Sequence, residues 1–447
     1  MRKLVFLVCL VSCFSCSNDD DNFITSISHT LSIRYGSDFE NLPAEGAQVT
    51  LVNNEDGRSY SGTVNPDGLL TLSLIPGVYN INVSRVFTPE AYQQFFGQSV
   101  NQNVTFNASL QNVQINANTS ANTSMELVTG LIGNLVLKQI YFAGSDVRLG
   151  ASLRDQFFEI HNNSNQTLYL DGLYFAQLRG TTRVPSNPRE YHLPNGQYDW
   201  SQSIGQDAGA ASNTDFVYAD EVLRIPGSGT QYPLEPGKSM IVAATALNHR
   251  APLVVQDENG ETVTFEVPEP NRTIDLSNAP FEGYFRPFQE SQGENWLDSD
   301  IDNPNSVNVE IAFKSVSSQD LILDAFGRDA FIIFFADDTQ FEGWKAVPLP
   351  SIGADNFSET TATFLRIPNS VIIDGVETQR DDPSRGKPKR LSDAIDAGEI
   401  STIRGAYSSE SVRRKIESQS EGRIFYKDTN NSTNDFEVLS IPEVNIP

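Results

Sequence analysis

The chain has 447 residues, and its 57 acidic against 31 basic side chains give a formal net charge of −26 at pH 7. An acidic surface repels phosphate backbones, so nucleic acid is excluded as an expected partner. A hydrophobic content of 39% with 10% aromatic residues excludes a disordered chain, and the length predicts two or three domains.

The amino-terminal segment has the pattern of a secretory leader. A basic start at Met1–Lys3 precedes an apolar run from Leu4 to Val11, and the small Ser15 precedes Cys16. The apolar run is shorter than the ~20 residues that a membrane-spanning helix needs. The pattern therefore predicts a lipoprotein signal peptide over residues 1–15, with Cys16 as the lipidation site.

Cys16 opens a short acidic tether, residues 16–22, which contains Asp19 to Asp21. A cysteine followed by an aspartate run resembles the export signal of surface lipoproteins of Bacteroidota. The resemblance implies a protein anchored by acyl chains such as palmitate in the outer membrane and facing the cell exterior. Cys13 ends a second lipobox-like sequence and is the alternative lipidation site. The alternatives to a lipoprotein are a soluble secreted protein with an ordinary leader and a protein whose apolar amino terminus is buried.

All 3 cysteines of the chain lie at positions 9, 13 and 16. The body that follows is therefore expected to have no disulfide, no thiolate metal site and no cysteine nucleophile. No later stretch reaches ~18 uninterrupted apolar residues, so the sequence predicts no transmembrane helix.

Residues 23–128 are predicted to form a small β-sandwich. Period-two alternation marks the strands, and turn signals such as Asn54–Gly57 and Asn65–Gly68 recur every eight to twelve residues, a spacing typical of sandwiches. Strands are expected over residues 30–35, 48–52, 60–64, 70–74, 78–83 and 104–110, with a helix over 89–96 and a polar link after residue 110.

Three segments of this domain, Gly46–Leu51, Gly62–Gly68 and Leu74–Tyr79, carry turn, glycine and strand signals in a shared order. They resemble the transthyretin-like modules known as carboxypeptidase-regulatory-like or CNA-B-like domains. The resemblance implies a spacer or docking unit near a membrane.

Residues 129–447 are predicted to form a second, larger sandwich, with longer strands over 135–142, 157–162 and 167–175. Asp155–Ser164 followed by Leu168–Leu173 resembles the opening of lamin-tail domains, which are immunoglobulin-like sandwiches. Later segments fit the same pattern, and long insertions fall outside it: residues 179–232, 243–274, 279–320 and 337–410.

Taken together, these segments resemble an uncharacterised family of Bacteroidota surface lipoproteins. The predicted fold class is all-β, with two β-sandwich domains, the first transthyretin-like and the second of the lamin-tail type. Variable loops on rigid sandwiches commonly carry recognition, so the insertions are the expected location of any binding site.

One insertion is crowded with aromatic side chains that are candidates for a binding loop. Aromatic residues in an irregular segment are able to stack on sugars or dock a protein, and they are equally able to staple a long loop to the sandwich. The candidate residues are Phe281, Tyr284, Phe285, Phe288 and Trp296.

The same insertion contains Asp298, Asp300 and Asp302, carboxylates at every second position that suit oxygen-ligated Ca²⁺. The familiar calcium loop has Gly at its sixth and Glu at its twelfth position, where this chain has Asn303 and Val309. A solvated acidic loop is the alternative, and no other cofactor is expected. The 4 histidines have no ligand spacing that indicates a metal.

A basic island interrupts the acidic chain at Arg385, Lys387, Lys389 and Arg390. Such a cluster is a candidate site for an anion or an acidic partner. The alternative is a solvated loop whose charge the neighbouring aspartates balance.

No nucleophile elbow or glycine-rich nucleotide motif is present in the sequence. We therefore expect a non-catalytic, surface-exposed outer-membrane lipoprotein that binds a ligand or partner. The expected partner is an outer-membrane protein, such as a TonB-dependent transporter that this chain assists. The alternatives are an adhesin or structural envelope protein, or a hydrolase with an assembled acidic site.

Overall fold

The computed structural model of the protein describes residues 25–36, 39–96, 104–119, 121–129, 135–164, 166–256, 260–315, 319–420 and 422–444. The predicted leader, both candidate lipidation sites (Cys13 and Cys16) and the acidic tether lie outside the described residues. Within the described part of the chain, no helix combines the length and the apolar character needed to cross a membrane.

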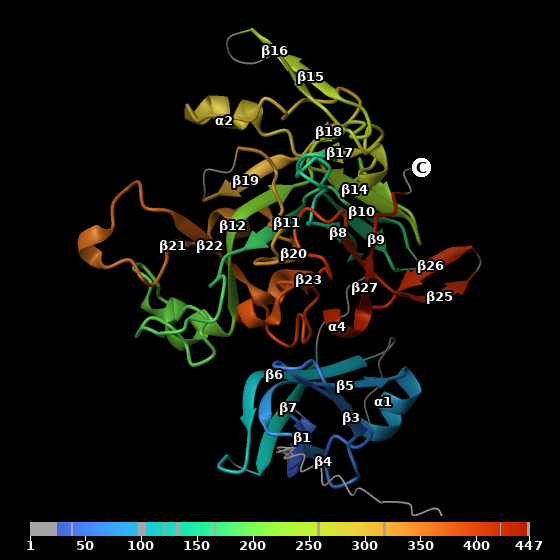
Figure 1. The fold of residues 1–447 in the computed structure, drawn as a ribbon, viewed down its shortest axis with the longest axis vertical. Coiled ribbons are helices and arrows are strands. Elements are labelled where there is room, and N and C mark those ends of the chain that lie inside the picture. Colours follow the sequence, from blue (N-terminus) through green and yellow to red (C-terminus); the bar gives the residue numbers. More distant parts are fainter. Residues whose placement is uncertain are drawn as a thin grey trace, which may run out of the picture.

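The described chain is almost entirely β, as predicted, and its sheets stack as sandwiches. Figure 1 shows a small body formed by β1 to β7 at one end of the molecule, and a larger body formed by the strands from β8 onward. The few helices are short and lie outside the sheets.

In the small body, alternate residues of each strand point into one core. In β1, Leu31, Ile33 and Tyr35 are buried while Arg34 is exposed, which is the pattern of a strand with one face in water. The aromatic rings of Tyr35 and Phe106 meet edge to face in this core, with centroids 4.7 Å apart. The elements are β1 Ile27–Tyr35, β2 Gln48–Asn53, β3 Ser59–Thr63, β4 Leu69–Leu74, β5 Gly77–Phe87, α1 Pro89–Phe96, β6 Val104–Ile115 and β7 Asn122–Thr129.

The strand order of the small body is β3-β2-β5-β6-β7-β1-β4, with β1 parallel to β7 and antiparallel to β4. The expected polar link after residue 110 was wrong. There β6 runs on to Ile115 along the long β5, past an irregularity at which Asn112 has a φ of 56°. A second strand, β7, follows, and its buried Met125 and Leu127 alternate with polar residues that hide the pattern in the sequence.

The large body has two facing sheets. Phe158 of β9 and Phe175 of β11 stack across its main core with ring centroids 3.7 Å apart. One sheet contains β21 Ala346–Pro348, β22 Thr363–Pro368, β12 Phe216–Arg224, β11 Leu173–Leu178, β20 Ala330–Phe335 and β23 Ile372–Glu377, with β19 Glu310–Lys314 paired to β12. The other contains β18 Val307–Asn308, β17 Phe281–Glu282, β14 Ser239–Ala243, β9 Phe157–Asn162, β8 Leu135–Tyr141, β24 Ser411–Arg414 and β27 Phe436–Leu439.

Smaller elements decorate this sandwich. Three two-stranded sheets are formed by β10 Leu168–Tyr169 with β13 Pro233–Leu234, β15 Leu253–Gln256 with β16 Thr262–Phe265, and β25 Ile416–Ser420 with β26 Arg423–Tyr426. The helices are α2 Arg286–Gln292, α3 Asp338–Glu342 and α4 Ser432–Asp435.

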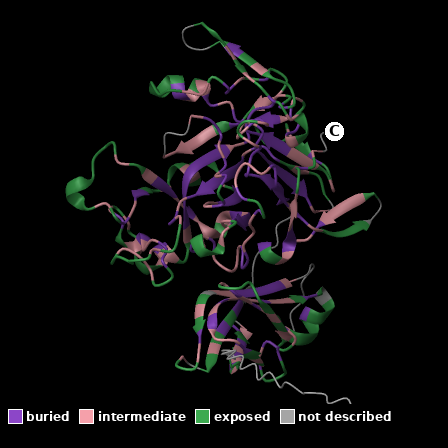
Figure 2. Cartoon of the chain, in the orientation of Figure 1, coloured by how far each residue is buried: buried purple, intermediate pink, exposed green. Residues whose placement is uncertain are grey.

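The central strands of the large body are buried on both faces. Every residue of β8, β9 and β11 is buried, and Figure 2 shows the buried colour concentrated in these sheets. The insertions cover the outer face; Phe341, for example, stacks on Tyr174 of β11. The single strand expected over residues 167–175 is divided into β10 and β11, because Gly172 has a φ of 74° in the turn between them.

The two bodies meet along β6, at the side of the large body where α4 lies (Figure 1). The Asn107 amide donates a hydrogen bond of 2.6 Å to the carbonyl of Thr429, and the Ser109 hydroxyl donates one of 2.7 Å to Asp393. Lys389 reaches both Ser109, at 3.2 Å, and Asp393, at 2.8 Å. Polar side chains on the outer face of the small sandwich therefore hold the bodies together.

Candidate functional site

A cavity of about 1190 Å³ lies where the two bodies meet. Sites for ligands often form at domain interfaces, and this volume is somewhat larger than the roughly 300–1,000 Å³ of ordinary small-molecule pockets. We call it the interdomain cleft. Its lining comprises residues 52–57, Asn80, Asn82 and Asn112 of the small body, and Arg183, Val184, Ser186, residues 379–387, Glu399, Ser401 and Thr433 of the large body.

The wall from the small body is built of side-chain amides. Asn80 and Asn82 alternate with buried residues along β5 and so point outward, whereas Asn54 follows β2 and Asn112 lies in the irregular part of β6. Asn54 donates to the amide oxygens of Asn80, at 3.1 Å, and Asn112, at 3.0 Å. The three side chains thus orient one another, and their remaining groups are available to a ligand.

The wall from the large body carries arginines. Arg385 is exposed over 71% of its side chain and has an ion pair with Asp382 at 3.5 Å. Arg380 donates from Nε to the carbonyl of Thr182 at 3.1 Å. Burial lowers the pKa of Arg380, and the nearby positive charges of Arg328 and Arg385 lower it further. Like charges thus lie close together on this wall of an acidic protein.

Carboxylates share the same wall. Hydrogen bonds from the side chain and the backbone of Ser384 lower the pKa of Asp382. Burial raises the pKa of Glu399, which accepts a hydrogen bond of 3.0 Å from Gln379. Asp381 packs against Gly405, where an added Cβ would lie 2.5 Å from its carboxylate oxygen. The cleft therefore offers cations, anions and amides to one occupant.

The structure does not assemble the predicted basic island into one patch. Arg385 alone of the four opens widely into the cleft, while Lys387 is fully buried and paired with Glu377. Arg390 is nearly buried and lies 3.4 Å from Asp329, and Lys389 serves the contact between the bodies. A buried cation needs a partner close by, and this requirement turns three of the four inward.

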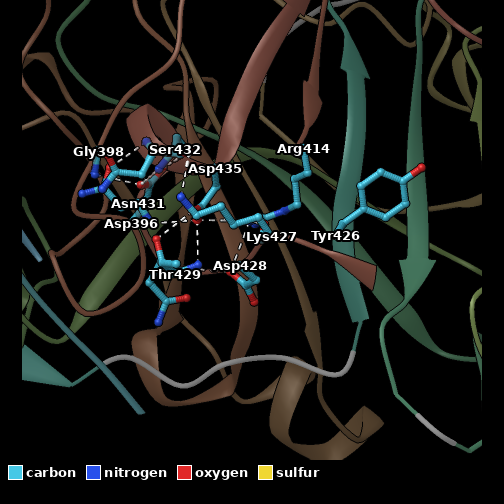
Figure 3. A network of polar contacts seen from close by, with 12 residues as sticks. Asp396, Gly398, Arg414, Tyr426, Lys427, Asp428, Thr429, Asn431, Ser432 and Asp435 are labelled. Carbon is cyan, nitrogen blue, oxygen red and sulfur yellow. Dashed lines mark hydrogen bonds and ion pairs between the residues drawn. The ribbon is translucent and has the colours of Figure 1, made fainter. Parts of the chain in front are cut away.

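Behind the cleft lies a network of buried charges, drawn in Figure 3. Asp396 accepts from the backbone amides of Ser432, at 2.8 Å, and Gly398, at 2.9 Å, and so joins α4 to the loop that carries Glu399. Arg414 is also part of the network and bonds to Asp374 at 2.7 Å and to Asp428 at 3.2 Å. This network holds in place the segment whose carbonyls receive the small body.

The predicted aromatic loop lies elsewhere, at the end of the large body that carries α2 (Figure 1). Phe281 and Phe285 are buried in the main core. Their side chains therefore anchor the insertion to the sandwich and are not accessible to a ligand. Tyr284, Phe288 and Trp296 are half-buried, and the guanidinium of Arg286 lies 4.9 Å from the Trp296 ring centre. A binding role for these three stays a prediction.

The candidate calcium residues point in different directions. Asp300 is buried, and its carboxylate accepts from the backbone amides of Phe285, at 3.1 Å, and Arg286, at 2.7 Å. Asp302 accepts from Asn308 at 2.8 Å, and Asp298 is exposed. Across the described residues, no group of three or more His, Cys, Asp and Glu side chains is placed to hold a metal ion. The calcium site stays a prediction without geometric support.

The histidines lie away from the cleft. Burial lowers the pKa of His161 and of His249 to about 4, so both rings are neutral at pH 7. His29 is buried against Thr123, and His192 accepts from the backbone amide of Arg189. None of them lines the cleft, so no imidazole base faces it.

Sequence reasoning missed most of the residues that line the cleft. Asn80 and Arg183 lie in no motif of the sequence. They line the same cleft only because the two bodies dock against each other. Two signals were available: the turn at Asn54–Gly57 and the placement of the insertions, since residues 183–186 and 379–401 of the large wall fall within two of them.

A search of solved structures finds matches to proteins from Bacteroides. A DUF4876 family protein from Bacteroides thetaiotaomicron VPI-5482 is 24% identical, with a TM-score of 0.49, over 92% of this chain and 94% of that chain. A candidate adhesin from Bacteroides ovatus ATCC 8483 is 9% identical, with a TM-score of 0.20, over 82% of this chain and 91% of that chain. Candidate polysaccharide-binding proteins (DUF1812) from Bacteroides thetaiotaomicron VPI-5482 are 9% identical, with a TM-score of 0.17, over 70% of this chain and 99% of that chain.

A search of curated proteins finds no match to the chain. The family model described as "Protein of unknown function (DUF4876)" matches residues 235–443. This span is slightly less than half of the chain and includes the arginine-bearing loop of the cleft. The carboxyl-terminal part of the large body is thus similar to the DUF4876 family.

Proposed function

We propose that this chain is a non-catalytic binding protein of the cell envelope that holds a polar ligand in the interdomain cleft. The observation that carries the proposal is the cleft itself, a large cavity in which amides, guanidinium groups and carboxylates from two bodies converge. Convergent polar groups in a preformed cavity are the usual basis of ligand recognition.

Binding is favoured over catalysis by what faces the cleft. Nucleophilic catalysis needs an activated Ser, Cys or Lys beside a base. Lys387, the lysine of the lining, is buried in an ion pair with Glu377. With no histidine or cysteine among the described lining residues, a hydrolase would have to use a carboxylate as its base.

The finer part of the proposal concerns location and partner. We place the protein on the outer face of the outer membrane, held by acyl chains on Cys16, with Cys13 as the alternative. The ligand would be handed to an outer-membrane partner such as a TonB-dependent transporter. The leader-like start of the sequence and the acidic tether support this placement.

The cleft is tested by filling it. Ser186 is exposed on the large wall, and a Ser186→Trp variant would occupy the cleft. Ser228, an exposed residue between β12 and β13, provides the matched control as Ser228→Trp. Molecules that co-purify with each protein from native membranes are identified by mass spectrometry. Loss of a bound species from the first variant alone supports the proposal, and equal retention by both refutes it.

The anchor and partner are tested in the same preparations. Mass spectrometry of the mature protein is expected to find acyl chains on Cys16, and the Cys16→Ser variant is expected to leave the membrane fraction. Isolation in mild detergent should recover an outer-membrane transporter with the wild-type chain. An unmodified amino terminus would overturn the anchor, and recovery with matrix polymer instead of a transporter would favour an adhesin.

A further inference from the structure

We infer that the interdomain cleft takes an acidic oligosaccharide, a chain of sugar units that bear carboxylate or sulfate groups. The inference rests on the proposed function and names the chemical class of its ligand. It follows from how cations, amides and carboxylates are distributed in the cleft, and from which kinds of side chain the lining lacks.

The cationic groups of the large wall are available for an anionic ligand. Arg183 is exposed and forms no ion pair with the described residues. Arg385 is largely exposed, and its one ion pair within the described part of the chain, with Asp382 at 3.5 Å, is long. Arg380 uses Nε for a backbone carbonyl, so its two terminal nitrogens remain for other partners. Guanidinium groups bind carboxylate and sulfate-like oxygens in a bidentate manner, which adds both energy and orientation.

The opposite wall suits hydroxyl groups. The Asn80 oxygen already accepts two hydrogen bonds, from the Asn54 amide at 3.1 Å and from the backbone amide of Asn112 at 3.0 Å. The amino groups of Asn80 and Asn112, and the whole amide of Asn82, have no partner among the described residues. A side-chain amide both donates and accepts, as a sugar hydroxyl does.

The carboxylates of the cleft limit what the ligand can be. Five carboxylates line it beside the three arginines, so a small, densely charged anion would meet repulsion as well as attraction. They are Glu55, Asp56, Asp381, Asp382 and Glu399. A carboxylate accepts hydrogen bonds from neighbouring hydroxyls. The mixture therefore favours a ligand that alternates acidic groups with hydroxyl groups.

The lining also excludes other ligand classes. Among its described residues none is aromatic, and the larger apolar side chains are limited to Val52, Val184 and Pro383. Nucleic-acid bases and neutral sugar rings gain much of their affinity by stacking on aromatic rings, which this cleft does not offer. A cavity of about 1190 Å³ exceeds the needs of a single small molecule and suits an oligomer.

The test titrates the purified full-length protein by calorimetry with three tetrasaccharides. These are tetragalacturonate, which carries carboxylates, a chondroitin sulfate tetrasaccharide, which also carries sulfates, and neutral maltotetraose. We expect at least one acidic probe to bind, with an affinity that falls as salt rises, and maltotetraose to bind at least tenfold more weakly.

Variants locate the interaction. Arg183→Ala and Arg385→Ala are each expected to weaken binding about tenfold, and Asn82→Ala roughly two- to tenfold. Arg286→Ala is the matched control: it removes the same charge from α2, which lies at the far end of the large body in Figure 1, and should leave affinity unchanged.

The other possible results distinguish between the acidic class of the ligand, the use of the cleft and the non-catalytic role. Equal binding of maltotetraose, or an unchanged affinity in both arginine variants, overturns the acidic class while leaving a binding cleft in place. Failure of both acidic probes overturns the inference, and the cleft-filling experiment then decides separately whether the proposed function stands. An acidic peptide, tetraglutamate, is titrated as a fourth probe, and its binding in the absence of binding by any saccharide would assign the cleft to protein recognition instead. Appearance of shorter fragments during the titration would overturn the non-catalytic role.

Discussion

Removal of the Arg414 side chain should destabilise the large body strongly, and more so at neutral than at acidic pH. Arg414 is 1% exposed, and it bonds to the carboxylates of Asp374, Asp428 and Asp435 at 2.7, 3.2 and 3.4 Å. It also donates to the carbonyl oxygens of Leu137 and Lys427. Arg414→Leu would leave three buried carboxylates without their shared cation. Figure 3 shows Arg414 with two of them, Asp428 and Asp435.

The magnitude follows from the cost of breaking a buried ion pair from one side. Loss of one partner typically costs about 3–5 kcal/mol because the other charge stays buried and unpaired. Several acceptors lose their donor here, so we expect a loss of about 4 kcal/mol in the free energy of unfolding at pH 7.5. Such a loss is a large fraction of the stability of a typical domain.

The pH dependence has a definite sign. Burial raises the pKa of Asp374 to about 7 and that of Asp435 to about 6, while Arg414 opposes the rise in both. Without Arg414 these values rise further above those of the unfolded chain, so the folded variant binds protons that the unfolded chain releases. The variant therefore regains stability as pH falls, by up to about 2.7 kcal/mol between pH 7.5 and 5.5 for each proton that is retained. Wild type regains less over the same range, because its two pKa values are lower than those of the variant.

Urea denaturation of wild type and variant at both pH values measures this difference. Arg413→Leu is the matched control, because Arg413 neighbours Arg414 on β24 yet pairs with the more exposed Glu437 and Glu443. Its loss should stay below about 1 kcal/mol. A loss of less than about 1 kcal/mol in Arg414→Leu at pH 7.5, or an equal loss at both pH values, would refute the reasoning.

Three further predictions concern other parts of the molecule. Burial raises the pKa of the Asp155 carboxyl to about 6. Ionisation of this group should therefore lower the free energy of unfolding of wild type by about 1.4 kcal/mol as pH rises from 5 to 8. Urea denaturation of the Asp155→Asn variant should lack this decrease. Gly327→Ala should lower the free energy of unfolding by about 2–4 kcal/mol. Gly327 has a φ of 65°, and an added Cβ would lie 2.2 Å from the carbonyl oxygen of Gln379. Thermal unfolding measures the change, and an unchanged melting temperature would contradict the close approach. The double variant Ser109→Ala, Asp393→Ala removes hydrogen bonds that join the bodies. Small-angle X-ray scattering should detect a larger radius of gyration, whereas an unchanged radius would show that other contacts suffice.

Local patterns in the sequence predicted the all-β class and most strand positions in the small body. Alternation in Thr30–Tyr35 and the turn at Asn54–Gly57 are properties of neighbouring residues, so they are readable without knowledge of the fold. The helix over 89–96 was predicted with its observed bounds, because Thr88 and Pro89 are a capping residue and a first-turn proline. Strand β7 was missed since its polar residues mask the alternation.

The site depended on contacts that no local pattern contains. Lys387 and Arg385 are two residues apart in the sequence, yet one is sealed against Glu377 and the other opens into the cleft, because packing in the large body determines which charge must be paired. Phe285 looked like a candidate ligand platform and is instead core. Asn80 and Arg385 are about three hundred residues apart in the chain, and they share a cleft only because β6 docks on the segment that Asp393 and Thr429 present. Strand propensity acts over a few residues, whereas burial, charge pairing and the docking of two bodies are properties of the whole folded chain.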